Sequence, residues 1–440
     1  MKNNKIVYLA VATALGSLST TAHSAGFQLA ETSATGLGRA FAGEAAMADN
    51  ASAQFRNPAL LSYLADTQVS AGGIYVNPNV DIDGTNTNTS GKKTATSTDD
   101  VAHDAVIPNF YFSHQLDDRL TAGIALATNF GMETDLGNDF TGTQFGNEAA
   151  VTTFEINPNL AWKATDQLRI GAGIRYVLGE GSIGAQANTT GSIQPIPAGS
   201  TLKYMEGDDR AWGWQLGAVY DINDKHRVGI NYRSEVDLTL EGHAEGLSFD
   251  QVAGKIPKQP NSTYDGSMDL TLPATAELSS LHQLTEQWAI HTSLNWTEWS
   301  SFDKLEADIP YLNGTQEVKV ENWEDNYRFA IGTTYQWDQQ LTLRSGIAYD
   351  TSAVSDQNRT LTIPETDRTW LSLGAGYEMT PQLTLDAAFT YVFAKDASVK
   401  EARDGINSES EKNAEANFGK FEGETTGNVW LVGVQASYRF

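Results

Sequence analysis

The clearest match to a chemical motif in this sequence is the stretch GEGSIG at residues 179–184. It fits the pattern GxGxxG, whose glycines let a backbone approach the pyrophosphate of a dinucleotide. That chemistry needs a strand before the glycines and a helix after them, because the helix N-terminus faces the phosphates. Here the glycines stand at the end of a strand-like pattern, and no helical pattern follows. Dinucleotide binding is therefore not expected.

Residues for hydrolysis or metal binding also lack the spacing that such chemistry needs. The seven histidines show no HExxH spacing, and no GxSxG nucleophile motif occurs. The chain has no cysteine, so its stability cannot come from disulfides. We expect no catalytic residue, no metal site and no cofactor.

The first 24 residues are typical of a secretory signal peptide. Lys2 and Lys5 precede a short apolar run from Ile6 to Leu18, and small residues surround a cleavage site after Ser24. The run is too short to cross a bilayer, and no later stretch holds the ~18 uninterrupted apolar residues of a membrane helix. The formal net charge is −26, and loss of both lysines takes the mature chain to −28. So acidic a chain lacks the basic face that nucleic-acid binding requires.

From Asp66 onward, apolar and polar residues alternate with a period of two, as they do in β-strands with one exposed polar face. The stretch LTLDAAFTYVF at 383–393 places aliphatic and aromatic residues on one face and threonine and aspartate on the other. A soluble β-sandwich shows the same alternation, so periodicity alone does not say which face meets water. The pattern predicts fourteen strands, at approximately 67–77, 102–113, 119–131, 149–163, 167–181, 206–221, 226–240, 267–283, 286–298, 319–336, 340–350, 360–378, 382–394 and 427–440.

Three further features favour a transmembrane barrel. Short polar turns alternate along the chain with longer loops, as in bacterial outer-membrane proteins. The chain ends on a strand with a terminal aromatic residue, Phe440, the signal that the barrel-assembly machinery reads during insertion. Aromatic residues also gather at strand ends, as interfacial girdles do: Phe110, Phe112, Trp212, Trp214, Tyr220, Tyr232, Trp288 and Trp296.

The predicted fold is all-β, a fourteen-stranded antiparallel barrel over residues 66–440 with an N-terminal hatch (plug) at residues 25–65. An even strand number lets an antiparallel barrel close, and only closure satisfies every backbone group in lipid. A barrel of this width has a lumen that its own wall does not fill. The segment before the first strand contains short helix-like pieces such as GRAFAGEAAMA and is interrupted at Asn57-Pro58. Its apolar residues argue against the alternative of a disordered periplasmic tail.

The chain resembles the FadL family of outer-membrane long-chain fatty-acid transporters along its whole length. In the hatch, the stretches AGFQL, TGLGRAFAGE and RNPAL carry the resemblance. In the barrel it rests on NYRSEV, YRFAIGTTY, QNRTLTIPETDRTWLSLG and the terminal strand. The resemblance implies a fourteen-stranded barrel closed by a hatch. It also implies passive transport: capture at the outer loops, binding in a lumen pocket, hatch rearrangement and lateral exit through a gap in the wall.

The same resemblance places the gap beside an inward kink of the third strand, next to the hatch. The hatch step would be Asn57, Pro58 and Ala59, and the small residue lining the gap on the second strand would be Ala105. On the third strand, the kink would involve Asn129, Phe130 and Gly131. A glycine within a strand commonly marks such a bulge or kink.

Ligand contacts are expected at a landing site and at a headgroup site. In the loop before the eighth strand, Leu247, Phe249 and Val252 have an amphipathic spacing, although a loop helix packed on its neighbours would show it too. For the carboxylate, the resemblance implies Lys319, while a second basic position falls on Ala185. Arg328 and Arg368 are inward-facing substitutes, unless they only pair with acids across the lumen.

The expected partners are a long-chain fatty acid, outer-membrane lipid and lipopolysaccharide, and the assembly machinery, and the protein is expected to be a monomer. Relatives of the same fold carry small apolar aromatic compounds, which is the alternative substrate class. A non-specific porin and an outer-membrane lipase are the competing functions.

Overall fold

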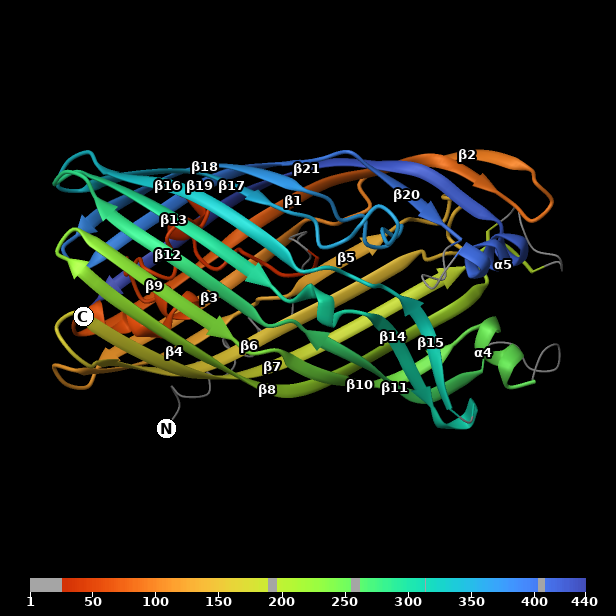
Figure 1. The fold of residues 1–440 in the computed structure, drawn as a ribbon, viewed down its shortest axis with the longest axis horizontal. Coiled ribbons are helices and arrows are strands. Elements are labelled where there is room, and N and C mark those ends of the chain that lie inside the picture. The colour runs from red at the N-terminus through yellow and green to blue at the C-terminus, as the bar shows by residue number, and fades with distance from the viewer. Residues whose placement is uncertain (1–25, 189–195, 255–261, 313, 403–407) are drawn as a thin grey trace, which may run out of the picture.

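The computed structural model describes residues 26–188, 196–254, 262–312, 314–402 and 408–440, so the predicted signal peptide lies outside it. The described residues form one antiparallel sheet that closes on itself as a fourteen-stranded barrel (Figure 1). Closure comes from the first and last strands, because Gln68–Thr87 pairs with Lys420–Arg439 along its whole length. The predicted fold class and strand number are confirmed.

Seven of the barrel strands are continuous. They are β1 (Thr67–Thr87), β6 (Glu148–Lys163), β7 (Leu168–Gln186), β8 (Thr201–Asn223), β17 (Leu341–Asp350), β18 (Arg368–Thr380) and β21 (Lys420–Arg439).

The other seven strands are each interrupted once. They are β2 (Lys93–Thr98) with β3 (Ala105–Gln115), β4 (Leu120–Ala127) with β5 (Gly131–Asp135), β9 (His226–Arg233) with β10 (Val236–Glu245), β11 (Thr263–Leu272) with β12 (Thr275–Gln283), β13 (Trp288–Thr297) with β14 (Lys304–Ile309), β15 (Gly314–Val320) with β16 (Asn326–Gln336), and β19 (Leu383–Ala394) with β20 (Ala397–Glu401).

Helices are short and lie in the hatch or in loops. They are α2 (Ala34–Leu37), α3 (Ala53–Arg56), η1 (Pro58–Tyr63), α4 (Leu247–Val252), η2 (Trp299–Ser301), η3 (Pro310–Leu312) and α5 (Ser408–Phe418). Among the described residues, no helix is both long and apolar enough for a membrane span.

The two ends of the barrel differ. One end carries the tight turns, the hatch and the C-terminus, whereas the opposite end carries α4, α5 and the longer strand extensions (Figure 1). On β8 the outward side chains from Trp212 to Tyr220 are aromatic or aliphatic and exposed, and beyond them Asp208 and Glu206 are exposed acids. The exposed apolar side chains continue to Ile222, so at ~3.3 Å per residue the run is about 33 Å long, and a strand tilted by about 40° then spans the ~25 Å height of a barrel's lipid-facing band.

The strand predictions miss most of the interruptions in the strands, for example within 226–240, 267–283 and 319–336, and they also fail at two other kinds of place. β1 continues to Thr87 and β21 begins at Lys420, because strands that rise above the lipid band are polar on both faces and look like loops in the sequence. Residues 360–367 were predicted as strand but form an inward loop. There the Leu361 N–H donates to Glu401 at 3.1 Å, and Pro364 has no N–H for a ladder.

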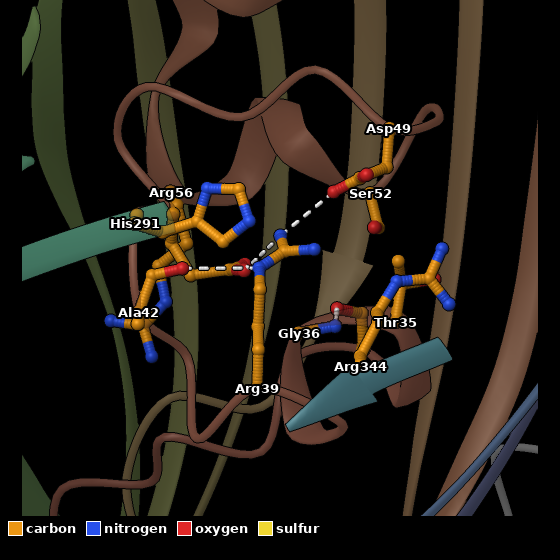
Figure 2. A network of polar contacts seen from close by, with 12 residues as sticks. Thr35, Gly36, Arg39, Ala42, Asp49, Ser52, Arg56, His291 and Arg344 are labelled. Carbon is orange, nitrogen blue, oxygen red and sulfur yellow. Dashed lines mark hydrogen bonds and ion pairs between the residues drawn. The ribbon is translucent and has the colours of Figure 1, made fainter. Parts of the chain in front are cut away.

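The hatch fills the lumen near the tight turns, and its core is a buried ion-pair network (Figure 2). The Arg39 guanidinium donates to Glu44 at 2.6 Å and forms an ion pair with Asp49 at 2.7 Å. The predicted helical piece at 38–48 is wrong: the chain runs through turns there, because Ala40 and Phe41 adopt φ of 51° and 52°. These pairs hold a tight irregular loop.

Candidate functional site

The barrel wall is incompletely paired between its second and third strands. β3 pairs with β4 only from Phe110 to Gln115, and no ladder pair of the described residues joins 105–109 to the third strand. Further out, one backbone hydrogen bond of the described residues, from the Asp135 N–H to the Val101 carbonyl at 2.8 Å, bridges the two strands. The third strand itself breaks between β4 and β5, at residues 128–130. We call the unpaired stretch between residues 105–109 and the third strand the wall gap.

The predicted gate residues of the wall lie at this gap. Ala105 is buried at the N-terminal end of β3, away from the tight turn that follows Gln115, and Asn129 and Phe130 lie in the break that Gly131 ends. Asn109 also borders the gap, and neither polar atom of its buried amide has a hydrogen-bond partner in the described structure.

The start of the hatch pairs with the break in the third strand. Gly131 donates to the Phe27 carbonyl at 2.8 Å, and Leu29 donates to the Asn129 carbonyl at 2.8 Å. Gln28 and Phe130 form an antiparallel bridge between them. A hatch segment thus supplies backbone pairing that the third strand lacks at its kink.

The Phe27 side chain is enclosed by aromatic rings. Its centroid lies 4.5 Å from that of Trp299, 5.6 Å from Phe302 and 5.9 Å from Trp323. Gly26 has φ +61°, and a Cβ there would lie 2.5 Å from the Trp299 ring. The residues Trp299, Phe302 and Trp323, here called the aromatic cage, were not predicted, although the aromatic-rich loop at 296–302 is visible in the sequence.

The Asn-Pro-Ala step lies elsewhere than the resemblance implies. The Asn57 side-chain amide donates a hydrogen bond to the Ala45 carbonyl at 2.8 Å, and its Oδ1 accepts one from the Ala59 N–H at 3.0 Å. The step packs on β7 and β8, where a Cβ at Gly171 or Gly217 would collide with it. Its expected place beside the kink is therefore wrong.

A large apolar cluster connects the gap to the outer mouth. It includes Phe27 and Phe130 at the kink, Leu238 and Leu240 on β10, and Phe249 on α4. Phe249 is only 5% exposed, so α4 packs inward on this outer apolar cluster. Leu247 is half-buried, and the side chain of Val252 lies outside the described part of the structure.

The three predicted basic residues already have protein partners. Lys319 lies 3.6 Å from Glu401, Arg328 lies 3.5 Å from Asp350, and Arg368 donates to Glu365 at 3.1 Å. The structure does not place all three at one carboxylate site, because Lys319 belongs to the outer segment β15, whereas Arg328 donates to the Ala40 carbonyl of the hatch at 3.0 Å.

A small polar cavity lies under the first hatch residues. Its volume is about 30 Å³, enough for water but not for an acyl chain, and Leu29, Arg56 and Arg328 help to line it. Glu31 is buried in the hatch, and its Oε2 has no hydrogen-bond partner among the described residues. Burial raises the pKa of Glu31 to about 7, an effect that the charges of Arg328, Arg368 and Arg56 only partly oppose.

The end of the hatch is clamped to the wall by Tyr63. The guanidinium groups of Arg169 and Arg227 lie 3.7 Å and 3.6 Å from its ring centroid. Its hydroxyl donates to Asp221 at 2.8 Å, and Asp221 pairs with both arginines. Sequence reasoning missed this clamp because its members come from η1, β7, β8 and β9.

Comparison with known proteins identifies the family. The family model described as outer membrane protein transport protein (OMPP1/FadL/TodX) matches residues 15–440. The chain belongs to this family. The long-chain fatty acid transport protein of Escherichia coli K12 is 34% identical, and the alignment covers 98% of each chain.

Solved structures of the FadL family agree with the fold. The crystal structure of a Pseudomonas aeruginosa FadL homologue matches with a TM-score of 0.83 at 25% identity, covering 94% of this chain and 100% of that one. The toluene transporter TbuX of Ralstonia pickettii matches with a TM-score of 0.66 at 16% identity, covering 93% and 98%. The protein is thus an outer-membrane transport protein of the FadL family.

Proposed function

We propose that this protein carries long-chain fatty acids passively across the bacterial outer membrane. The observation that carries the proposal is the hatch segment Phe27–Leu29, which pairs with the kinked third strand beside an unpaired stretch of wall. The outer apolar cluster leads from the mouth to this point. The fatty-acid substrate is favoured by relatives named as long-chain fatty acid transport proteins at 34% identity.

The proposed path begins at the outer loops near α4 and ends in the membrane. An acyl chain enters along the outer apolar cluster and competes with Phe27 for the aromatic cage. Release of Phe27 breaks the backbone pairing of the hatch segment with Gly131 and Asn129. The ligand then passes between β3 and the third strand, at Ala105, into the lipid.

The clamp at Tyr63 and the buried pairs of Arg39 support a lateral exit. The clamp fixes the end of the hatch to the wall, and the Arg39 pairs hold the hatch loop together, so the floor of the barrel stays closed while the first hatch residues move. We further propose that lipopolysaccharide surrounds the outer mouth, that the assembly machinery recognises the terminal strand, and that the protein works as a monomer without enzymatic activity.

The substrate class is tested by titrating purified protein with oleate and with toluene. We expect oleate to bind more tightly, and preferential binding of toluene would favour the small aromatic alternative.

The exit is tested by uptake of oleate into cells that carry Ala105→Glu. The added carboxylate would fill the gap and place an unpaired charge across an apolar path, where burial is costly. We expect normal insertion, retained oleate binding and lost uptake, while Ala105→Ser, which stays small, retains uptake. Uptake at the wild-type rate by Ala105→Glu would contradict the lateral route.

A further inference from the structure

Lys203 is a cation at the outer mouth that has no acidic partner within ion-pair distance among the described residues. It lies near the start of β8, and its Nζ donates to the Val318 carbonyl oxygen on β15 at 2.9 Å. β8 and β15 are not neighbours in the sheet, so this contact crosses the lumen. Among the described residues, no carboxylate oxygen lies within 4 Å of Lys203 Nζ.

Lys319, the residue after Val318, differs from Lys203 because it has a carboxylate partner. Its Nζ lies 3.6 Å from Glu401 and 3.4 Å from the Thr362 hydroxyl. Glu401 is 3% exposed and also accepts the Leu361 N–H at 3.1 Å. The charge of Lys319 is therefore balanced within the protein, and its counter-ion also holds the inward loop.

Lys203 has a polar cavity on one side and apolar side chains of the lumen on the other. It lines a cavity of about 230 Å³ together with Tyr204 and Ala185. Met205, two residues along β8, belongs to the outer apolar cluster, and Val318 packs against that cluster. Glu148 and Glu245 also line this cavity and would repel a carboxylate, whereas the Lys203 Nζ faces Val318 across the lumen.

We propose that Lys203, and not Lys319, supplies the ammonium that binds the carboxylate of an entering fatty acid. The inference rests on the proposed function and names the residue that selects a carboxylate at the outer mouth of the barrel. Ala185, where the family resemblance implies a second basic residue, is the direct cross-strand partner of Lys203. Lys203 therefore places the positive charge on β8, next to Ala185 on β7, and the acyl chain of the bound fatty acid would extend toward Met205.

The test is binding of oleate and of oleyl alcohol to purified protein by titration calorimetry. Lys203→Met keeps the length of the side chain and removes its charge. We expect it to weaken oleate binding by about tenfold or more, the range of a hydrogen bond to a charged group, and to change alcohol binding by less than about twofold. Lys203→Arg should retain oleate affinity. Lys304→Met is the matched control, because Lys304 is an exposed outer lysine that pairs with Glu306.

A selective loss for oleate in Lys203→Met, without one in Lys319→Met, supports the assignment. A selective loss for oleate in both Lys203→Met and Lys319→Met would overturn the assignment to Lys203 alone. A selective loss only in Lys319→Met, or equal affinity of wild-type and Lys203→Met protein for oleate, overturns it and leaves the proposed function standing. If wild-type protein binds neither ligand, the proposed function itself fails. Heat-modifiable migration of each variant on gels establishes that its barrel is folded.

Discussion

Gly131 donates its backbone N–H to the carbonyl oxygen of Phe27 at 2.8 Å, so the kink in the barrel wall is completed by a residue of the hatch. The two residues lie about a hundred positions apart in the chain, Phe27 in the hatch and Gly131 in the wall. The ring of Phe27 is also enclosed by the aromatic cage. The same few residues therefore touch the apolar path and the unpaired wall. In the proposed mechanism, a ligand that enters the cage alters the wall without moving the whole hatch.

Replacing Tyr63 by alanine is expected to loosen the floor of the barrel. The variant loses two cation–π contacts worth about 1 kcal/mol each and the hydrogen bond to Asp221. Ion conductance of the purified protein in planar bilayers should rise, while Tyr63→Phe, which keeps the ring, should show a smaller rise. Oleate uptake should stay near the wild-type rate in both. Loss of uptake in Tyr63→Ala with unchanged conductance would argue against a fixed floor.

Arg39→Met is expected to destabilise the hatch loop strongly. It leaves the buried Glu44 and the partly exposed Asp49 without their partner, and loss of the buried Arg39–Glu44 pair alone costs about 3–5 kcal/mol. Amide hydrogen exchange over residues 34–50 should accelerate. The triple variant Arg39→Met/Glu44→Gln/Asp49→Asn should exchange more slowly than the single variant because no uncompensated charge remains. Faster exchange in the triple variant would contradict this account of the network.

Closure of the hatch is expected to weaken as the pH rises through about 7. The pKa of Glu31 in the folded protein lies above its usual value of 4.5, so the folded state favours the protonated carboxyl. Its contribution is complete below about pH 4.5 and is lost as the carboxyl ionises near pH 7. Conductance should be higher at pH 8 than at pH 5.5, and Glu31→Gln should remove the difference. An unchanged pH dependence in Glu31→Gln would exclude this residue as the cause.

Much of the architecture could be predicted because lipid imposes a simple rule on sequence. The outward side chains of the spanning strands must be apolar and the inward ones polar, so alternation and aromatic strand ends identify fourteen strands. The rule ends at the membrane surface. For this reason the polar extensions of β1 and β21 and the inward loop at 360–367 were predicted incorrectly.

The site was less predictable because its contacts join residues far apart in the chain. Gly131 and Ala105 were predicted as gate residues from a glycine in a strand and a resemblance of motifs. The pairing of Phe27 with Gly131, the enclosure of Phe27 by Trp299, and the contact of Lys203 with Val318 depend on how the strands are arranged in the closed barrel. Neither periodicity nor motif spacing carries that information.

A disulfide between the hatch and the kink tests the central claim most directly. Gln28 and Phe130 form an antiparallel bridge, a geometry whose Cα separation of about 4.5–5.5 Å suits a disulfide. The chain has no cysteine, so Gln28→Cys/Phe130→Cys creates a single possible pair. The measurement is oleate uptake by cells with the pair oxidised and then reduced, with each single variant as a control. The account predicts that oxidation abolishes uptake and that reduction restores it, whereas uptake at the wild-type rate with the disulfide fully formed would contradict release of the hatch segment.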